Sequence, residues 1–132
     1  MGMDLGITAA KSISEVTDDN WADHYDYDEI KENREVTDED GNFIRTLNHP
    51  IDVWYARKFY GLLDNIPELK ESYNDPYVVR VDKKILKKMI EYYSFHEDYF
   101  EGFSGLPRLC ELYRDYDHLQ AQGLNLYFWN SY

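Results

Sequence analysis

The residues with the clearest chemical potential are the carboxylates crowded between Glu15 and Asp40. This stretch holds twelve Asp and Glu side chains against two bases, Lys31 and Arg34, whereas the rest of the chain carries fourteen acids and twelve bases. Duplex DNA displays one negative charge per about 1.7 Å of its axis. A surface with closely spaced carboxylates can therefore compete with nucleic acid for a basic groove on another protein.

Aromatic side chains interleave with these carboxylates in WADHYDYDEIKE and would anchor such an interface, because buried aromatic residues often dominate binding energy. The competing interpretation is a solvated acidic insertion that only keeps the protein soluble. The residues that the DNA-mimic hypothesis assigns to partner binding are Asp18, Asp19, Trp21, Asp23, Tyr25, Asp26, Tyr27, Asp28, Glu29 and Glu32.

A second group of residues has the chemistry of a nucleotide pocket. Aromatic rings can stack on a base, while guanidinium and ammonium groups pair with phosphates. The competing interpretation is that the aromatic residues belong to the core and the bases lie at its rim. The residues of this alternative ligand pocket are Trp54, Tyr55, Arg57, Lys58, Arg80, Tyr127 and Trp129.

The spacing of the candidate ligand residues does not match the known calcium and zinc motifs. In DEDGN, placing Gly41 at position six of a calcium loop puts Val36 and Leu47 at the ligand positions one and twelve, which excludes an EF-hand. A zinc helix that starts at His96 would need a second histidine where Phe100 stands. No phosphate-binding glycine loop or nucleophile elbow is present. We therefore predict no catalytic residues, no metal and no cofactor, and expect that the protein is not an enzyme.

The remaining reactive side chains favour structural interpretations. A single cysteine, Cys110, excludes an internal disulfide, and we interpret it as inert packing on a core-facing helix stripe. Asp115, Asp117 and His118 could contribute to an acid–base site, but a solvated helix face is the favoured interpretation.

Composition limits the class of protein. The 132 residues, 43% of them hydrophobic, predict a single folded domain over 1–132 with an acidic insertion at about 15–40. The net charge of −12 argues against direct binding of nucleic acid or of an anionic membrane. Because neither a signal peptide nor an apolar run of membrane-spanning length is visible, we expect a soluble, cytoplasmic protein.

Hydrophobic periodicity predicts the elements that position these residues. Met3–Ile7 and Leu124–Trp129 alternate with a period of two, as does a shorter β-branched run at Tyr77–Val81, and all three predict strands. Pro50–Ile66 carries an apolar stripe at helical spacing and predicts an amphipathic helix. The DEDG stretch that ends at Gly41 predicts a hairpin turn.

Two further helices are predicted in the second half of the chain. One follows Asp82 as its N-cap and presents its apolar stripe through Tyr93. The other is opened by Ser104 or Gly105 together with Pro107 and is closed by Gly123. The predicted fold is α+β, with the N- and C-terminal strands in one small sheet packed by about three helices.

Four stretches, MGMDLGI, VWYARKFYGLL, YVVRVDKKILKKMI and LNLYFWNSY, resemble a family of small, mostly uncharacterised bacteriophage proteins with an MGLDMYL-type N-terminus. The resemblance covers both ends and the middle but not residues 12–48, and Ala56 interrupts the family's Trp-Arg-Lys order. It implies a phage origin and an α+β fold, and none of its motifs is catalytic.

Together these observations predict a phage-encoded inhibitor acting in the cytoplasm of a bacterial host cell. Its partner would be a host protein, of defence or of nucleic-acid handling, with a basic nucleic-acid-binding surface. The alternative is a small-molecule binding protein that sequesters a host signalling nucleotide.

Overall fold

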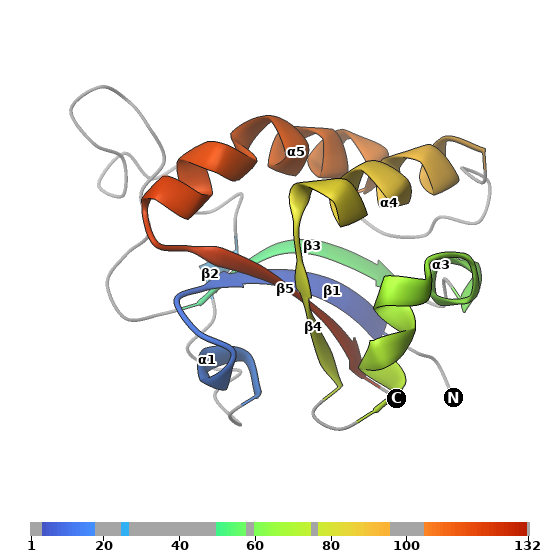
Figure 1. Ribbon diagram of the computed structural model, residues 1–132, viewed down its shortest axis with the longest axis horizontal. Helices are drawn as coiled ribbons and strands as arrows, with labels where there is room; N and C mark the ends of the chain where they lie inside the picture. The colour runs from blue at the N-terminus through green and yellow to red at the C-terminus, as the bar shows by residue number, and fades with distance from the viewer. Residues whose placement is uncertain are drawn as a thin grey trace.

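The protein is built on a five-stranded sheet with the strand order β2-β3-β1-β5-β4 (Figure 1). The computed structural model describes residues 4–17, 25–26, 50–57, 60–74, 77–95 and 105–131, with only the backbone described for residues 25, 26, 57, 60, 94 and 95. The predicted turn at DEDG lies outside these ranges. The strands are β1 (Asp4–Ala10), β2 (Tyr25–Asp26), β3 (Ile51–Arg57), β4 (Val78–Val81) and β5 (Asn125–Ser131). The helices are α1 (Ser14–Thr17), α3 (Tyr60–Asn65), the 3-10 helix η3 (Pro67–Tyr73), α4 (Lys83–Phe95) and α5 (Gly105–Ala121).

The two terminal strands form the centre of this sheet. β1 and β5 pair antiparallel along their whole length, from Asp4 opposite Ser131 to Ala10 opposite Asn125. The period-two pattern at both ends of the sequence follows from this position, because each strand packs two different faces. The predicted α+β fold, with both terminal strands in one sheet packed by helices, is confirmed.

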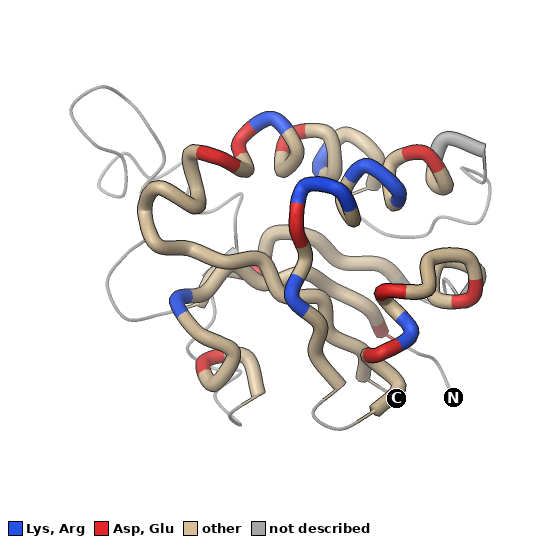
Figure 2. The backbone as a smooth tube through the Cα atoms, viewed as in Figure 1, with Lys and Arg blue, Asp and Glu red and all other residues tan. Residues whose placement is uncertain are grey.

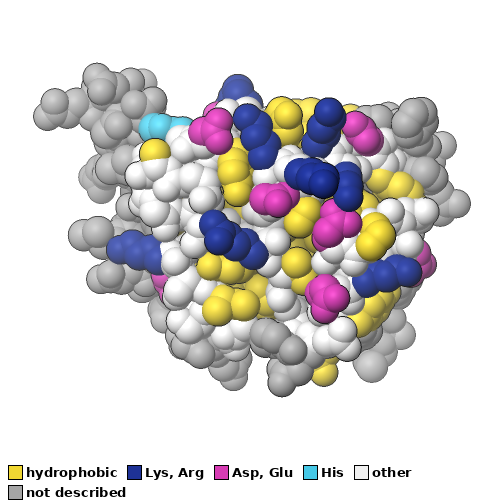
Figure 3. Space-filling model, viewed as in Figure 1, with side chains coloured by type: hydrophobic (Ala, Val, Ile, Leu, Met, Phe, Trp, Pro, Cys, Tyr) yellow, Lys and Arg dark blue, Asp and Glu magenta, His cyan; other side chains and the backbone are white. Residues whose placement is uncertain are grey.

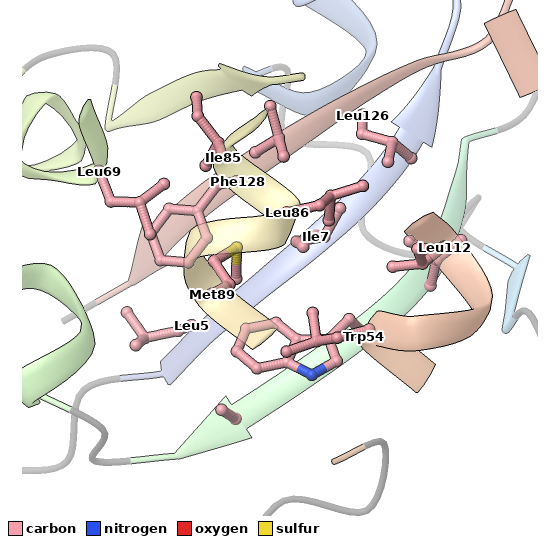
Figure 4. Close-up of a cluster of buried hydrophobic side chains, with 14 of the residues drawn as sticks. Leu5, Ile7, Trp54, Leu69, Ile85, Leu86, Met89, Leu112, Leu126 and Phe128 are labelled. Carbon is pink, nitrogen blue, oxygen red and sulfur yellow. The ribbon is translucent and has the colours of Figure 1, made fainter. Parts of the chain in front are cut away.

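One face of the sheet carries the main hydrophobic core under α4 and α5 (Figures 1 and 4). Leu5 and Ile7 of β1 and Phe128 of β5 are completely buried there. The helices supply Leu86, Met89 and Leu112, among others, which point into the same cluster (Figure 4).

The predicted ends of the two long helices are confirmed. The Asp82 carboxylate accepts the Ile85 backbone N–H at 2.8 Å, which is N-cap geometry for α4. After α5, Gly123 adopts a φ of 80°, and the Leu124 N–H donates to the Leu119 carbonyl at 3.0 Å. This bond from C″ back to the last turn is the Schellman arrangement that favours glycine.

The helix predicted over Pro50–Ile66 is wrong for its first half. Residues 51–57 form β3, and only Tyr60–Asn65 is helical, as α3. The buried residues of β3 all belong to the core under the helices; they are Ile51, Val53, Trp54 and Ala56. Because Val53 and Trp54 are adjacent, the strand does not alternate, and such a run cannot be told from a helix by periodicity alone.

A β-bulge in β3 further obscured that pattern. Ile7 pairs with Trp54 but Thr8 pairs with Asp52, which leaves Val53 as the extra residue. The Val53 carbonyl accepts a 2.9 Å hydrogen bond from Nη1 of the buried Arg108 on α5. The bulge therefore fixes one end of α5 against the sheet.

The second face of the sheet packs aromatic rings over small residues. The Trp129 indole lies so close to Gly6 that a Cβ there would overlap the ring. The Trp129 Nε1–H donates to Thr8 Oγ1 at 3.0 Å, and the Thr8 hydroxyl donates to Asp52 Oδ1 at 2.8 Å. Val16 of α1 joins this smaller cluster, which lies on the opposite side from α4 and α5.

Candidate functional site

The acidic segment meets the described part of the chain at one sheet edge. Tyr25 and Asp26 form β2, which pairs parallel to β3 opposite Ile51 and Asp52. β2 is thus the strand farthest from β4 in the sheet. The other predicted partner-binding residues lie outside the described residues; they are Asp18, Asp19, Trp21, Asp23, Tyr27, Asp28, Glu29 and Glu32.

The four aromatic residues of the alternative pocket are divided between the two faces of the sheet. Trp54 is 1% exposed and belongs to the core under the helices. Tyr55, Tyr127 and Trp129 belong to the smaller cluster on the second face. Lys58 lies outside the described residues, as does the side chain of Arg57.

The aromatic residues on the second face use their polar ends within the protein. The Tyr55 hydroxyl donates to Asp4 Oδ1 at 2.7 Å, and the rings of Tyr55 and Trp129 lie 6.4 Å apart at 49°. The Tyr127 hydroxyl accepts from Asn125 Nδ2 at 3.3 Å. Together with the Trp129–Thr8 bond, these contacts make the rings part of the packing, and they leave less aromatic surface for a stacked base.

Arg80 is the one basic residue of the pocket set whose side chain is described. It is exposed on the edge strand β4, opposite Tyr127. Its Nη2 donates to the side-chain oxygens of Asn125 at 3.0 Å and Gln120 at 3.4 Å. Both acceptors are neutral, so the guanidinium charge has no carboxylate partner within the described ranges.

Four lysines in the first two turns of α4 form a basic surface that the sequence analysis did not assign (Figure 2). Lys83 pairs with Asp117 at 3.5 Å and Lys88 with Glu68 at 2.6 Å. Lys84 and Lys87 are exposed and form no ion pair among the described residues, although Lys84 lies near the Glu68 carboxylate. Their helical spacing shows that they lie off the apolar stripe, but the sequence alone does not show which lysines are paired.

Two titratable groups have displaced pKa values. The hydrogen bond from Lys88, a backbone hydrogen bond and the nearby Lys84 charge hold the pKa of Glu68 below its usual value. Burial raises the pKa of Tyr116, although Arg80 opposes the shift. Both shifts arise from ordinary packing and ion pairing at the helix surfaces.

The prediction that Cys110 packs into the core is wrong, because Cys110 is exposed. Leu109 and Leu112 are the buried residues of that turn, and Cys110 lies about 100° around the helix from Leu109.

The acid–base candidates on α5 have separate partners. Asp115 accepts from Arg114 Nε at 2.9 Å, Asp117 pairs with Lys83, and the His118 ring contacts Gln122 at 3.0 Å. Within the described ranges, no three His, Cys, Asp or Glu side chains are grouped so that they could hold a metal ion.

Comparisons with known proteins give no match. No protein-family model, curated protein or solved structure matches the chain. In the part of the chain that is described, no helix has both the length and the apolar character needed to cross a membrane. Fold and charge distribution are therefore the observations that bear on function.

Proposed function

We propose that this protein is a phage-encoded inhibitor whose acidic segment, residues 15–40, occupies the basic nucleic-acid-binding surface of a host protein. The observation that carries the proposal is the segregation of charge, with twelve acids against two bases in this segment and near balance elsewhere. Inhibition by occupancy needs no catalytic group, and we propose that the protein is not an enzyme.

The attachment of β2 to the sheet supports this proposal. Backbone pairing of Tyr25 and Asp26 with β3 ties the middle of the acidic segment to a folded scaffold. A binding segment that is held before it meets its partner loses less conformational entropy on binding. A tethered polyanion is therefore a better competitor for a basic groove than an unattached acidic chain.

The carboxylates would act collectively. A single exposed ion pair contributes only about 0–1 kcal/mol. A cluster of one sign instead steers association with an oppositely charged surface and repels the natural polyanion. Trp21 and Tyr25 would add the apolar anchors that slow dissociation.

The nucleotide-binding alternative has less support from the geometry. Trp54 packs on the far side of the sheet from the other aromatic candidates, and Tyr55 and Trp129 direct their polar atoms to Asp4 and Thr8. The observation in its favour is the Arg80 guanidinium, which bonds only neutral oxygens. A bound nucleotide would raise the melting temperature, and above Kd the added stability would grow with the logarithm of nucleotide concentration.

The test compares two triple variants of equal charge change. Asp23→Asn/Asp28→Asn/Glu29→Gln removes three of the twelve carboxylates of the acidic segment without changing the residues of β2. Asp64→Asn/Glu71→Gln/Glu91→Gln neutralises three exposed acids elsewhere. The wild-type protein first captures its partner from bacterial lysate, and association rates are then measured with that purified partner.

The segment variant should associate about tenfold more slowly at low salt, with a smaller difference at high salt. The control variant should match the wild type, and wild-type protein should block binding of duplex DNA to the partner. Equal rates for both variants, or simultaneous binding of DNA, would remove the DNA-mimic proposal.

A further inference from the structure

We propose that the outer edge of strand β4 binds an extended acidic segment of a partner protein by strand addition. This edge is at the opposite end of the sheet from β2. The proposal therefore concerns a second interface of opposite charge and does not depend on the role of residues 15–40.

The hydrogen-bond register shows which backbone groups of β4 point outward. The Asn130 N–H donates to the Tyr77 carbonyl at 3.1 Å, so these two residues form a hydrogen-bonded pair. Hydrogen-bonded and non-hydrogen-bonded pairs alternate along an antiparallel ladder. Val79 and Val81 therefore bond to β5, whereas Val78 and Arg80 direct their N–H and C=O groups away from it.

These outward groups form an open template. β5 is the only strand that pairs with β4 among the described residues, and the backbone groups of Val78 and Arg80 have no other partner there. β4 crosses in front of β5 and β1 in Figure 1, so its edge faces the viewer. A row of unpaired backbone groups at an exposed edge is what an added strand recognises.

The charge around this edge selects an acidic strand. Arg80 on β4 and Lys87 on α4 are exposed and have no carboxylate partner within the described ranges, and Lys84 is exposed near Glu68 without forming an ion pair there. Viewed from the side of this edge, the Lys and Arg side chains over β4 and α4 are interspersed with Asp and Glu side chains (Figure 3). α4 begins two residues after β4 ends, and the Asp82 carboxylate between them already caps the positive end of the α4 dipole.

Lysines in the first turns of a helix oppose the helix dipole, so this arrangement is unfavourable to the isolated fold. Lys83 and Lys88 offset that cost through Asp117 and Glu68. Carboxylates of a docked strand would do the same for Lys84 and Lys87.

Tyr77, at the start of the edge, supports the assignment. Its side chain is 44% exposed and its backbone φ is 65°, a conformation that bulky residues rarely adopt. Such backbone geometry concentrates at functional positions. Here it presents an aromatic ring at one end of β4, where an added strand would begin or finish its pairing.

The experiment uses the full chain labelled with 15N and a fluorescent peptide of alternating Glu and Val. In the protein alone, the amides of Val78 and Arg80 should exchange with solvent quickly and those of Val79 and Val81 slowly. Bound peptide should slow exchange at Val78 and Arg80 by at least about tenfold. A control peptide of the same sequence, N-methylated at every amide, should lose this protection and its affinity, because neither of its edges can donate backbone hydrogen bonds.

Charge is tested with matched double variants. Lys84→Gln/Lys87→Gln should weaken peptide binding about threefold to thirtyfold, as expected for two exposed charges. Lys11→Gln/Arg114→Gln, which removes two positive charges elsewhere, should bind the peptide like the wild type. Thermal melting of both variants checks that each is folded.

Three results would overturn the proposal. The first is an absence of peptide binding, or equal binding of the N-methylated peptide. The second is equal binding of a single-stranded oligonucleotide without protection of Val78 and Arg80, which would make the surface a general polyanion site. The third is protection of these amides that rises with protein concentration alone, which would assign the edge to a second copy of the chain.

Discussion

The two faces of the central strand pair β1–β5 are held by different physical means. On the face under α4 and α5, Leu5, Ile7 and Phe128 contribute apolar area to a large cluster. On the second face, the Trp129 ring lies against Gly6 and hydrogen-bonds to Thr8. A core held together by buried apolar area accepts apolar side chains of different shapes. Close contact between a ring and the backbone, or a specific hydrogen bond, instead requires a particular residue type at each position. The same two strands therefore combine a tolerant face and a demanding one.

The largest effect is expected on the tolerant face. Phe128→Ala should lower the free energy of unfolding by about 3–5 kcal/mol, because it removes a fully buried ring and leaves a cavity. Urea denaturation measures the change. Phe128→Leu should recover most of it, since a similar volume is restored; if Leu is as damaging as Ala, this face is as demanding as the other.

On the second face, the addition of one methyl group should be nearly as damaging. Gly6→Ala places a Cβ inside the space of the Trp129 ring, which should cost about 1–3 kcal/mol and change the tryptophan fluorescence. In the double variant with Trp129→Leu, the Gly6→Ala substitution should cost much less. An additive double-mutant cycle would show that Gly6 and Trp129 are not coupled.

The polar contact on the second face should come next. Thr8→Val preserves the shape of the side chain but leaves the Trp129 N–H and Asp52 without the shared hydroxyl. The expected loss is about 1–2 kcal/mol in the free energy of unfolding. Thr8→Ser keeps the hydroxyl and should be milder than Val; the reverse order would mean that the methyl group matters more than the bonds.

The smallest effect should come from a buried polar residue on the helix-covered face. Asn130 lies opposite Leu5, is 5% exposed, and neither amide atom of its side chain has a hydrogen-bond partner among the described residues. Asn130→Leu has nearly the same shape and should change stability by less than about 1 kcal/mol, or increase it. If urea denaturation instead shows a large loss in the free energy of unfolding, the Asn130 side chain makes a polar contact that stabilises the fold.

The elements that sequence analysis predicted correctly are those with one dominant signal. The alternation at both chain ends indicated β1 and β5, and Asp82 and Gly123 marked one end each of α4 and α5. Each of these signals is local: side chains alternate along a strand, and a cap satisfies the backbone groups at a helix end. Neither signal depends on residues that are distant in the sequence. These features could therefore be predicted from the amino-acid sequence alone.

The missed elements depend on neighbours that are distant in sequence. Residues 51–57 do not alternate because a bulge at Val53 interrupts their pairing with β1, and the Val53 carbonyl accepts a hydrogen bond from Arg108 of α5. The same limit applies to the candidate sites. The sequence grouped Trp54 with Trp129, which the sheet separates, and it could not show that Lys88, and not Lys84, forms the ion pair with Glu68.

The strand order has a consequence for synthesis of the protein on the ribosome. β1 is among the first segments made, yet one of its two neighbours is β5, which is made after every other described element. β4 likewise depends on β5 as its only partner among the described strands. A nascent chain that stops before Asn125 leaves one side of β1 and the inner side of β4 without backbone partners. The sheet therefore closes in a late step, and until then the unfinished chain exposes strand edges to chaperones or to other nascent chains.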